Sequence, residues 1–249
     1  MDQALIKQAA AALVEARRTM MPLAGLPAGT SPTTTADAHA IQDETTAQLG
    51  QAVVAYKAMA PATGDATRGL IYAGTVHAAP AAIPARLVPQ CGVEGEVAFI
   101  FRKDLPRRAT PYTREEVAAA VDALAAIEVV HGRFPVDAAV SGLDKLADSI
   151  SNGALVCGEP KADWRSLDLG KLRVTLDVNG APVLGQIGGH PTGDPLGVAV
   201  VLVNMLPNGV KAGQYVTCGS CTGLRYLTPG DTCTVKFAGL GEAEVVFKP

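Results

Sequence analysis

Three glutamates interrupt two apolar segments of the sequence. Glu94 and Glu96 lie in "VEGEVAFIF", and Glu128 lies in "AIEVV". The surrounding β-branched and aromatic residues predict strands that are buried on both faces. Side chains alternate along a strand, so Glu94 and Glu96 share one face. Two carboxylates ~4 Å apart repel by about 4 kcal/mol at an effective dielectric of 20, so either a cation lies between them or they are not buried.

A divalent metal ion would explain all three acids together. Hard cations such as Mg²⁺ and Mn²⁺ prefer all-oxygen sites built from carboxylates and water. Alternate residues of a strand have Cα atoms ~6.6 Å apart, so Glu94 and Glu96 can both reach one ion. The alternative is that each acid pairs with a lysine or arginine, or lies at an exposed strand end. That alternative is favoured for one isolated glutamate, but for three we predict a metal site formed by Glu94, Glu96 and Glu128.

A lysine occupies a further apolar segment, "VVAYKAM", at position 57. Lys57 can extend its ammonium group to solvent, as lysines in apolar surroundings usually do. It can also balance the excess negative charge of three carboxylates around one divalent ion. In that second case it can hold a substrate carboxylate or move a proton.

The segments before these strands predict a helical N-terminal segment over residues 1–50. An Ala-rich helix covers residues 3–18, and a second helix over residues 36–50 ends at a glycine. Residues 51–249 are then expected to form the catalytic domain.

Short apolar strands dominate from residue 53 onward, and two helices interrupt them. Asn-Gly in "VNGAP" predicts a hairpin between two strands. One helix is predicted over residues 110–126, with a capping signal at Thr113 and Glu116, and runs directly into the strand of Glu128. The other covers residues 193–207 and is apolar nearly all round. This pattern predicts an α+β architecture.

Composition favours a small-molecule partner. The chain has 249 residues, of which 48% are hydrophobic and 18% charged, and its net charge is −3. No block of lysine and arginine is present, so neither nucleic acid nor an anionic membrane is an expected partner. The start of the chain lacks the pattern of a signal peptide, and no apolar run is long enough to span a bilayer, so we expect a cytoplasmic protein. Five scattered cysteines, an odd number, argue against a disulfide framework.

A set of ordered motifs resembles a known family. The motifs are "AYKAM", "VEGEVAFIFRKDLP", "AIEVVHGRF", "ADSISNGALVCG", "GDPLGVAVVLVN", "AGQYVTCGSCTGL" and "PGDTCTVKFAGLGEAEVVF". Together they resemble the 2-keto-4-pentenoate hydratase branch of the fumarylacetoacetate hydrolase superfamily, from roughly residue 36 to the end. The resemblance implies a mixed β-roll fold, Mg²⁺ or Mn²⁺ held by Glu94, Glu96 and Glu128, and a 2-oxo acid substrate. It also implies a homo-oligomer, which in relatives can associate with a partner pathway enzyme.

The resemblance also implies roles for residues outside the acidic cluster. Lys57 matches a lysine at the active site of the relatives. The expected substrate-binding residues besides Lys57 are Arg133, Asp148, Ser151 and Ser220.

Two of the departures from the family pattern bear on the proton donor. Tyr72, in "LIYAGT", stands where hydratases carry an acid that is a candidate proton carrier, and His131 introduces an imidazole in "HGR". Either residue could supply the proton instead, although a structural histidine on a strand is the commoner case.

The leading functional prediction is a metal-dependent hydratase that adds water to a 2-hydroxy-2,4-dienoate in aromatic-compound degradation. A 2-oxo acid decarboxylase or an acylpyruvate-type C–C hydrolase would use the same stabilised enolate. A catalytically silent homologue that supports a partner enzyme is a third reading. Product analysis separates the first two, because only decarboxylation releases CO₂.

Overall fold

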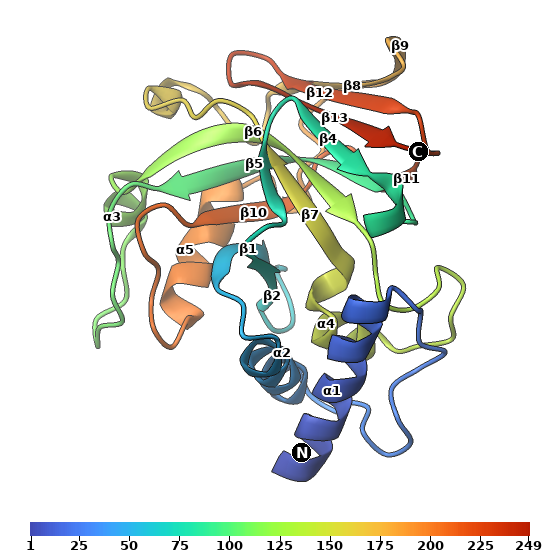
Figure 1. Cartoon of the computed structure of the whole chain (residues 1–249). Coiled ribbons are helices and arrows are strands. Elements are labelled where there is room, and N and C mark those ends of the chain that lie inside the picture. The colour runs from blue at the N-terminus through green and yellow to red at the C-terminus, as the bar shows by residue number, and fades with distance from the viewer.

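The computed structural model describes residues 1–249 and contains two β-sheets and five α-helices (Figure 1). The larger sheet has the strand order β2-β1-β10-β5-β6-β7-β3, with β11 paired to β5. Its strands are β1 (Val53–Met59), β2 (Thr67–Tyr72), β3 (Val76–Ala78), β5 (Gly92–Phe101), β6 (Val121–Val130), β7 (Asn152–Cys157), β10 (Tyr215–Ser220) and β11 (Arg225–Tyr226).

The smaller sheet has five strands in the order β4-β13-β12-β8-β9. They are β4 (Ala81–Pro84), β8 (Arg173–Val178), β9 (Ala181–Ile187), β12 (Thr232–Phe237) and β13 (Gly241–Lys248). The predicted hairpin is confirmed between β8 and β9, where Asn179 and Gly180 have φ values of 52° and 76°. Positive φ at both central residues is what such a tight hairpin turn requires.

The helices are α1 (Gln3–Thr19), α2 (Thr35–Leu49), α3 (Arg114–Ala118), α4 (Gly142–Ala147) and α5 (Pro195–Met205). Short 3₁₀ turns cover Ala85–Leu87, Ser149–Ser151 and Trp164–Ser166. The two predicted N-terminal helices are confirmed. Thr34 forms a reciprocal capping box with Asp37 at the start of α2, and Gly50 ends this helix in the left-handed conformation. The helix predicted near residue 200 is confirmed as α5, which Asp194 caps.

Two sequence predictions about helices are wrong. The helix predicted over residues 110–126 ends at Ala118, and the strand β6 begins at Val121. Pairing of all ten residues of β6 with β5 overrides the helix propensity of its alanines. Helix α4 was not predicted; Ser141 begins it through a capping box with Asp144.

The main hydrophobic core joins the two sheets and α5. Phe99 of the larger sheet and Leu176 and Phe247 of the smaller one are fully buried in this cluster. A separate cluster joins α1, α2 and α4 around Phe134. Figure 1 shows these three helices on the side of the molecule opposite the smaller sheet. None of the helices has the length and apolar character needed to cross a membrane.

Candidate active site

The three glutamates converge on one face of the larger sheet. Strands β5 and β6 are antiparallel, with Glu94 directly opposite Glu128, and Glu96 follows two residues along β5. One carboxylate oxygen from each residue lies within 4.8 Å of the other two. Glu96 and Glu128 are fully buried, and Glu94 is half-buried. Strand register and alternation are therefore enough to build the cluster.

Lys57 of β1 completes this group of charges. Its Nζ lies 2.8 Å from Glu128 Oε2 and 3.5 Å from Glu94 Oε2. Burial opposes the charged form, but the carboxylates of Glu128, Glu94 and Glu96 outweigh it and raise the pKa of Lys57 above its ordinary value. The lysine is therefore a fixed positive charge at neutral pH, and it does not extend to solvent.

One oxygen of Glu96 lacks a partner within the protein. Glu96 Oε2 accepts a hydrogen bond of 2.8 Å from the Gly219 amide, whereas Oε1 is buried without any hydrogen-bond partner. The register of β10 is irregular between Thr217 and Ser220, and Gly219 has a φ of 118°, a conformation that favours glycine. Burial, and then repulsion from Glu128, raises the pKa of Glu96 to about 8.

A cavity of about 450 Å³ opens onto this cluster. Lys57, Glu94 and Glu96 line it together with apolar side chains, including Met59, Phe134, Val136, Ile150 and Leu224. Such a cavity, apolar in its walls and with charged groups converging at one place, is typical of small-molecule sites.

The sequence matches the family model "Fumarylacetoacetate (FAA) hydrolase C-terminal" over residues 41–248. The chain belongs to the fumarylacetoacetate hydrolase family. The matched region contains every residue of the acidic cluster and the lysine. The resemblance inferred from the motifs is thereby confirmed at the level of the family.

The curated relatives of the chain include two hydratases. It is 33% identical over 158 residues to 2-hydroxyhexa-2,4-dienoate hydratase of Comamonas testosteroni, covering 62% of this chain and 59% of the relative. It is 27% identical over 187 residues to 2-keto-4-pentenoate hydratase of Paraburkholderia phymatum, covering 74% of this chain and 71% of the relative. The match thus spans about three fifths of the length of the first relative.

Solved structures with a similar fold include 4-oxalocrotonate decarboxylase from Pseudomonas putida G7, complexed with magnesium and adipate. It has a TM-score of 0.86 and 21% identity, and the match covers 99% of this chain and 98% of the decarboxylase. Fumarylpyruvate hydrolase from Pseudomonas aeruginosa, in complex with Mn²⁺ and pyruvate, has a TM-score of 0.54, 14% identity and coverage of 78% and 89%. These likenesses confirm the predicted α+β fold of the fumarylacetoacetate hydrolase type.

Two of the predicted substrate-binding residues line the cavity beside the acids. Ser220 lies opposite Glu96 across β10 and β5, and Ser151 precedes β7. With Lys57, these serines place hydrogen-bonding groups around the carboxylate cluster.

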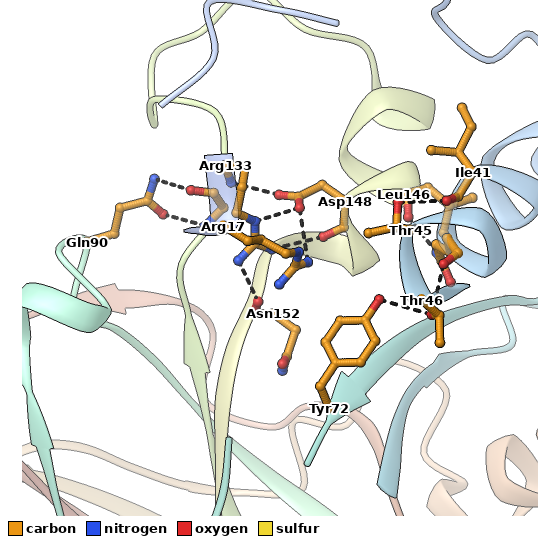
Figure 2. Close-up of polar contacts among 12 residues, drawn as sticks. Arg17, Ile41, Thr45, Thr46, Tyr72, Gln90, Arg133, Leu146, Asp148 and Asn152 are labelled. Carbon is orange, nitrogen blue, oxygen red and sulfur yellow. Dashed lines mark hydrogen bonds and ion pairs between the residues drawn. The ribbon is translucent and has the colours of Figure 1, made fainter. Parts of the chain in front are cut away.

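Tyr72 and His131, the candidate proton donors, lie outside this cavity and line a separate one. Tyr72 is three residues beyond Gly69, the β2 partner of Lys57, which displaces it by ~10 Å along the strand. Its hydroxyl lies 3.1 Å from Thr46 Oγ1 (Figure 2). His131 follows Glu128 by three residues, so the alternation of side chains places it on the opposite face from Glu128. Neither side chain therefore faces the carboxylates.

Arg133 and Asp148, predicted to bind substrate, form a buried ion pair instead. Arg133 Nε lies 2.6 Å from Asp148 Oδ1 (Figure 2). Neither residue lines the cavity of the glutamates. Burial lowers the pKa of Arg133 to about 10, so the guanidinium stays charged at neutral pH.

His190 and Lys145 also line the cavity. The Nε2 atom of His190 lies 2.7 Å from the Cys218 carbonyl, and its Nδ1 lies 3.3 Å from the Thr192 amide. Both ring nitrogens are thus occupied, and burial lowers its pKa. Lys145 extends from α4, a helix that was not predicted from sequence.

Proposed function

We propose that the protein is a divalent-metal-dependent hydratase, a hydro-lyase that adds water to a 2-hydroxy-2,4-dienoate or its 2-oxo-4-enoate tautomer in aromatic-compound degradation. The observation that carries the proposal is the convergence of Glu94, Glu96 and Glu128 beside Lys57 in a cavity of about 450 Å³. The similarity to two curated hydratases supports the choice of reaction.

The acidic cluster fits a hard divalent cation. Its donors are all carboxylate oxygens, which suits Mg²⁺ or Mn²⁺. Three carboxylates face one lysine, and Glu96 Oε1 is buried without a hydrogen-bond partner. Desolvated negative charge of this kind requires a counter-ion. When bound, the ion supplies Lewis-acid stabilisation of negative charge that develops on a 2-oxo acid.

The remaining residues bind and orient the substrate. The Lys57 ammonium, held charged by its neighbours, attracts the substrate carboxylate. Ser151 and Ser220 offer hydroxyl groups to its polar end, while Met59, Val136 and Leu224 enclose the hydrocarbon tail and exclude water from it. The catalytic work is assigned to residues 51–249, and residues 1–50 form a helical segment that packs on them.

One observation favours a second candidate, a 2-oxo acid decarboxylase with a dicarboxylate substrate. Lys145 lines the cavity and is exposed, so its ammonium group is available to a ligand. A second substrate carboxylate would pair with it. Two relatives, 29% and 27% identical, are 4-oxalocrotonate decarboxylases of Pseudomonas.

A substrate panel tests the proposal. The purified protein is incubated with Mg²⁺ and 2-hydroxydienoates, 4-oxalocrotonate or acylpyruvates, while ultraviolet absorbance is followed and products are identified. Hydration is expected to give a 4-hydroxy-2-oxo acid, and it should stop when EDTA is added. Release of CO₂ would favour the decarboxylase. Absence of turnover across the panel, with metal bound, would refute both candidates and leave the non-catalytic homologue.

Formation of a homo-oligomer, and association with a partner pathway enzyme, belong to the same proposal. Sedimentation velocity of the purified protein tests the first, and co-purification with the enzymes of the same degradation sequence tests the second.

A further inference from the structure

The segment between α4 and β7 contains a turn in an unfavourable backbone conformation. Ser149, Ile150 and Ser151 have φ values of 53°, 55° and 58°. A side chain other than glycine avoids this left-handed region, and three such residues in succession are rarer still. A turn of this kind persists only where its surroundings determine it, and such turns cluster at functional sites.

Two glycines provide the space for this left-handed turn. A Cβ atom added at Gly69 would lie 2.6 Å from the carbonyl oxygen of Ser149. One added at Gly132 would lie 2.9 Å from Ser151 Oγ. Both distances are below van der Waals contact, so a side chain at either position would clash with the turn. Gly69 of β2 lies against the backbone of Ser149, and Gly132, two residues beyond β6, lies against the Ser151 side chain.

Arg133 spans the left-handed turn from one end to the other (Figure 2). At the first end, its Nη2 donates to the Asp148 carbonyl at 3.1 Å, and its Nε donates to Asp148 Oδ1 at 2.6 Å. At the other end, its Nη1 donates to the Asn152 carbonyl at 2.9 Å. Arg133, Asp148 and Asn152 are 5%, 1% and 4% exposed, so water competes for none of these bonds. The planar guanidinium can make these bonds together because its donors are fixed in a fork.

The left-handed turn and Asn152, the residue that follows it, contact two charged groups of the active site. The Ile150 carbonyl lies 3.5 Å from Lys57 Nζ. The Asn152 side-chain amide donates to Glu128 Oε1 at 2.9 Å. A carboxylate only accepts hydrogen bonds, so the amide nitrogen of Asn152 must face it.

We infer that Arg133 is a positioning residue, which holds the left-handed turn so that Asn152 orients Glu128 and the Ile150 carbonyl orients Lys57. The inference rests on the metal site of the proposed function but not on which reaction the site catalyses. It gives Arg133 a role through the carboxylate cluster in place of the direct substrate contact that the family resemblance implied. Partners of metal ligands are worth 10–100-fold in metal affinity in other proteins.

Arg17 provides a matched control. Its Nη2 lies 3.2 Å from the same oxygen, Asp148 Oδ1, but it donates to no carbonyl of the left-handed turn. Lysine at either position keeps the positive charge beside Asp148 and loses the fork of donors. Arg133→Lys and Arg17→Lys therefore separate the neutralisation of Asp148 from the bridging of the turn.

The experiment measures Mn²⁺ affinity by electron paramagnetic resonance of the free ion, together with turnover. Arg133→Lys is expected to weaken Mn²⁺ binding at least tenfold and to lower turnover even at saturating Mn²⁺, because Lys57 is also displaced. Arg17→Lys is expected to stay within twofold of the wild-type affinity. Equal affinities in Arg133→Lys and the wild type, or equal losses in both lysine variants, would overturn the inference.

A second variant covers the case in which Arg133→Lys fails to fold. Asn152→Ala removes only the amide that faces Glu128 and keeps the carbonyl that Arg133 binds. It is expected to weaken Mn²⁺ binding about fivefold to tenfold while keeping a native circular dichroism spectrum. An unchanged affinity would refute the claim that Asn152 orients Glu128 for metal binding. A wild-type protein that binds no Mn²⁺ would overturn the metal site itself, and this inference with it. Mn²⁺ binding without hydratase activity would overturn only the proposed reaction.

Discussion

Replacement of Glu96 by glutamine changes the charge of the acidic cluster with little change in its shape. Glu96 is fully buried, and burial and Glu128 raise its pKa to about 8. The ordinary pKa is 4.5. At pH values between the two, the metal-free folded protein keeps a proton that the unfolded chain releases, so its stability falls as the pH rises through this window.

The size of the effect at pH 7 follows from these two pKa values. Each pH unit between the ordinary pKa of 4.5 and pH 7 lowers the free energy of unfolding by about 1.4 kcal/mol. At pH 7 the buried carboxyl group therefore costs the metal-free protein about 3 kcal/mol of stability. Glutamine has no such cost and keeps an oxygen for the Gly219 amide, but its unpaired NH₂ group costs about 1–2 kcal/mol. The metal-free variant should therefore be about 1–2 kcal/mol more stable than the wild type, which raises Tm by about 3–6 °C.

With metal bound, we expect the wild type to be more stable than the Glu96→Gln variant. At a concentration about a hundredfold above its Kd, Mn²⁺ adds about 2.7 kcal/mol to the stability of the wild type and nothing to a variant that cannot bind it. Thermal unfolding is measured at pH 7 in EDTA and in Mn²⁺, with Glu242→Gln, at an exposed glutamate of β13, as the control. A Glu96→Gln variant that melts below the wild type in EDTA, or that gains as much from Mn²⁺, would refute the reasoning.

Three further predictions concern the lysine, the core and a half-buried histidine. Lys57→Met removes the cation 2.8 Å from Glu128 and should lower turnover at least 100-fold with Mn²⁺ binding intact; wild-type turnover would make the lysine structural. Phe99→Ala removes a fully buried ring packed edge-to-face on Trp164 and should cost about 3–5 kcal/mol in denaturant unfolding, whereas a cost below about 1 kcal/mol would contradict the packing. His39 has its pKa lowered to about 4 by burial and by Arg68, whose amide donates to its Nε2. The contribution of neutral His39 to stability is complete above pH 6.5 and is lost as the pH falls towards 4. After allowance for solvent screening, this histidine should lower the free energy of unfolding by about 1 kcal/mol at pH 5 relative to pH 7. Denaturant unfolding at the two pH values measures this difference, which should be absent in His39→Gln.

The acidic cluster could be predicted from sequence because its signal is local. Each glutamate is an acid in a strand that otherwise contains apolar residues, and alternation fixes which face it occupies. The contact of Lys57 with Glu128 depends instead on the order β1-β10-β5-β6, in which two strands separate the two residues. Charge balance allowed this lysine to join the site, but its own segment also allowed the solvent-exposed position that is usual for lysine, and the family resemblance favoured the site.

The predictions that failed depended on contacts between distant segments. Residues 119–126 have the alanines of a helix, but their pairing with β5 makes most of them a strand. Arg133 and Asp148 are close in sequence to residues of the cavity, yet each satisfies the other in the interior. A charged residue near a site in sequence can thus bind substrate or support the residues that do, and only the position of its partner decides between them.

The N-terminal helices α1 and α2 also support the residues around the left-handed turn. Gln42 of α2 is fully buried, and its side-chain amide donates to the carbonyls of Arg68 and Leu146 at 2.8 and 2.5 Å. These bonds join α2 to β2 at Arg68, the residue before Gly69, and to α4 at Leu146, three residues before the left-handed turn. Arg17 of α1 adds its ion pair with Asp148. Residues 1–50 therefore hold both sides of the left-handed turn, next to Glu128 and Lys57. We expect a chain that lacks them to bind metal more weakly even where its two sheets remain folded.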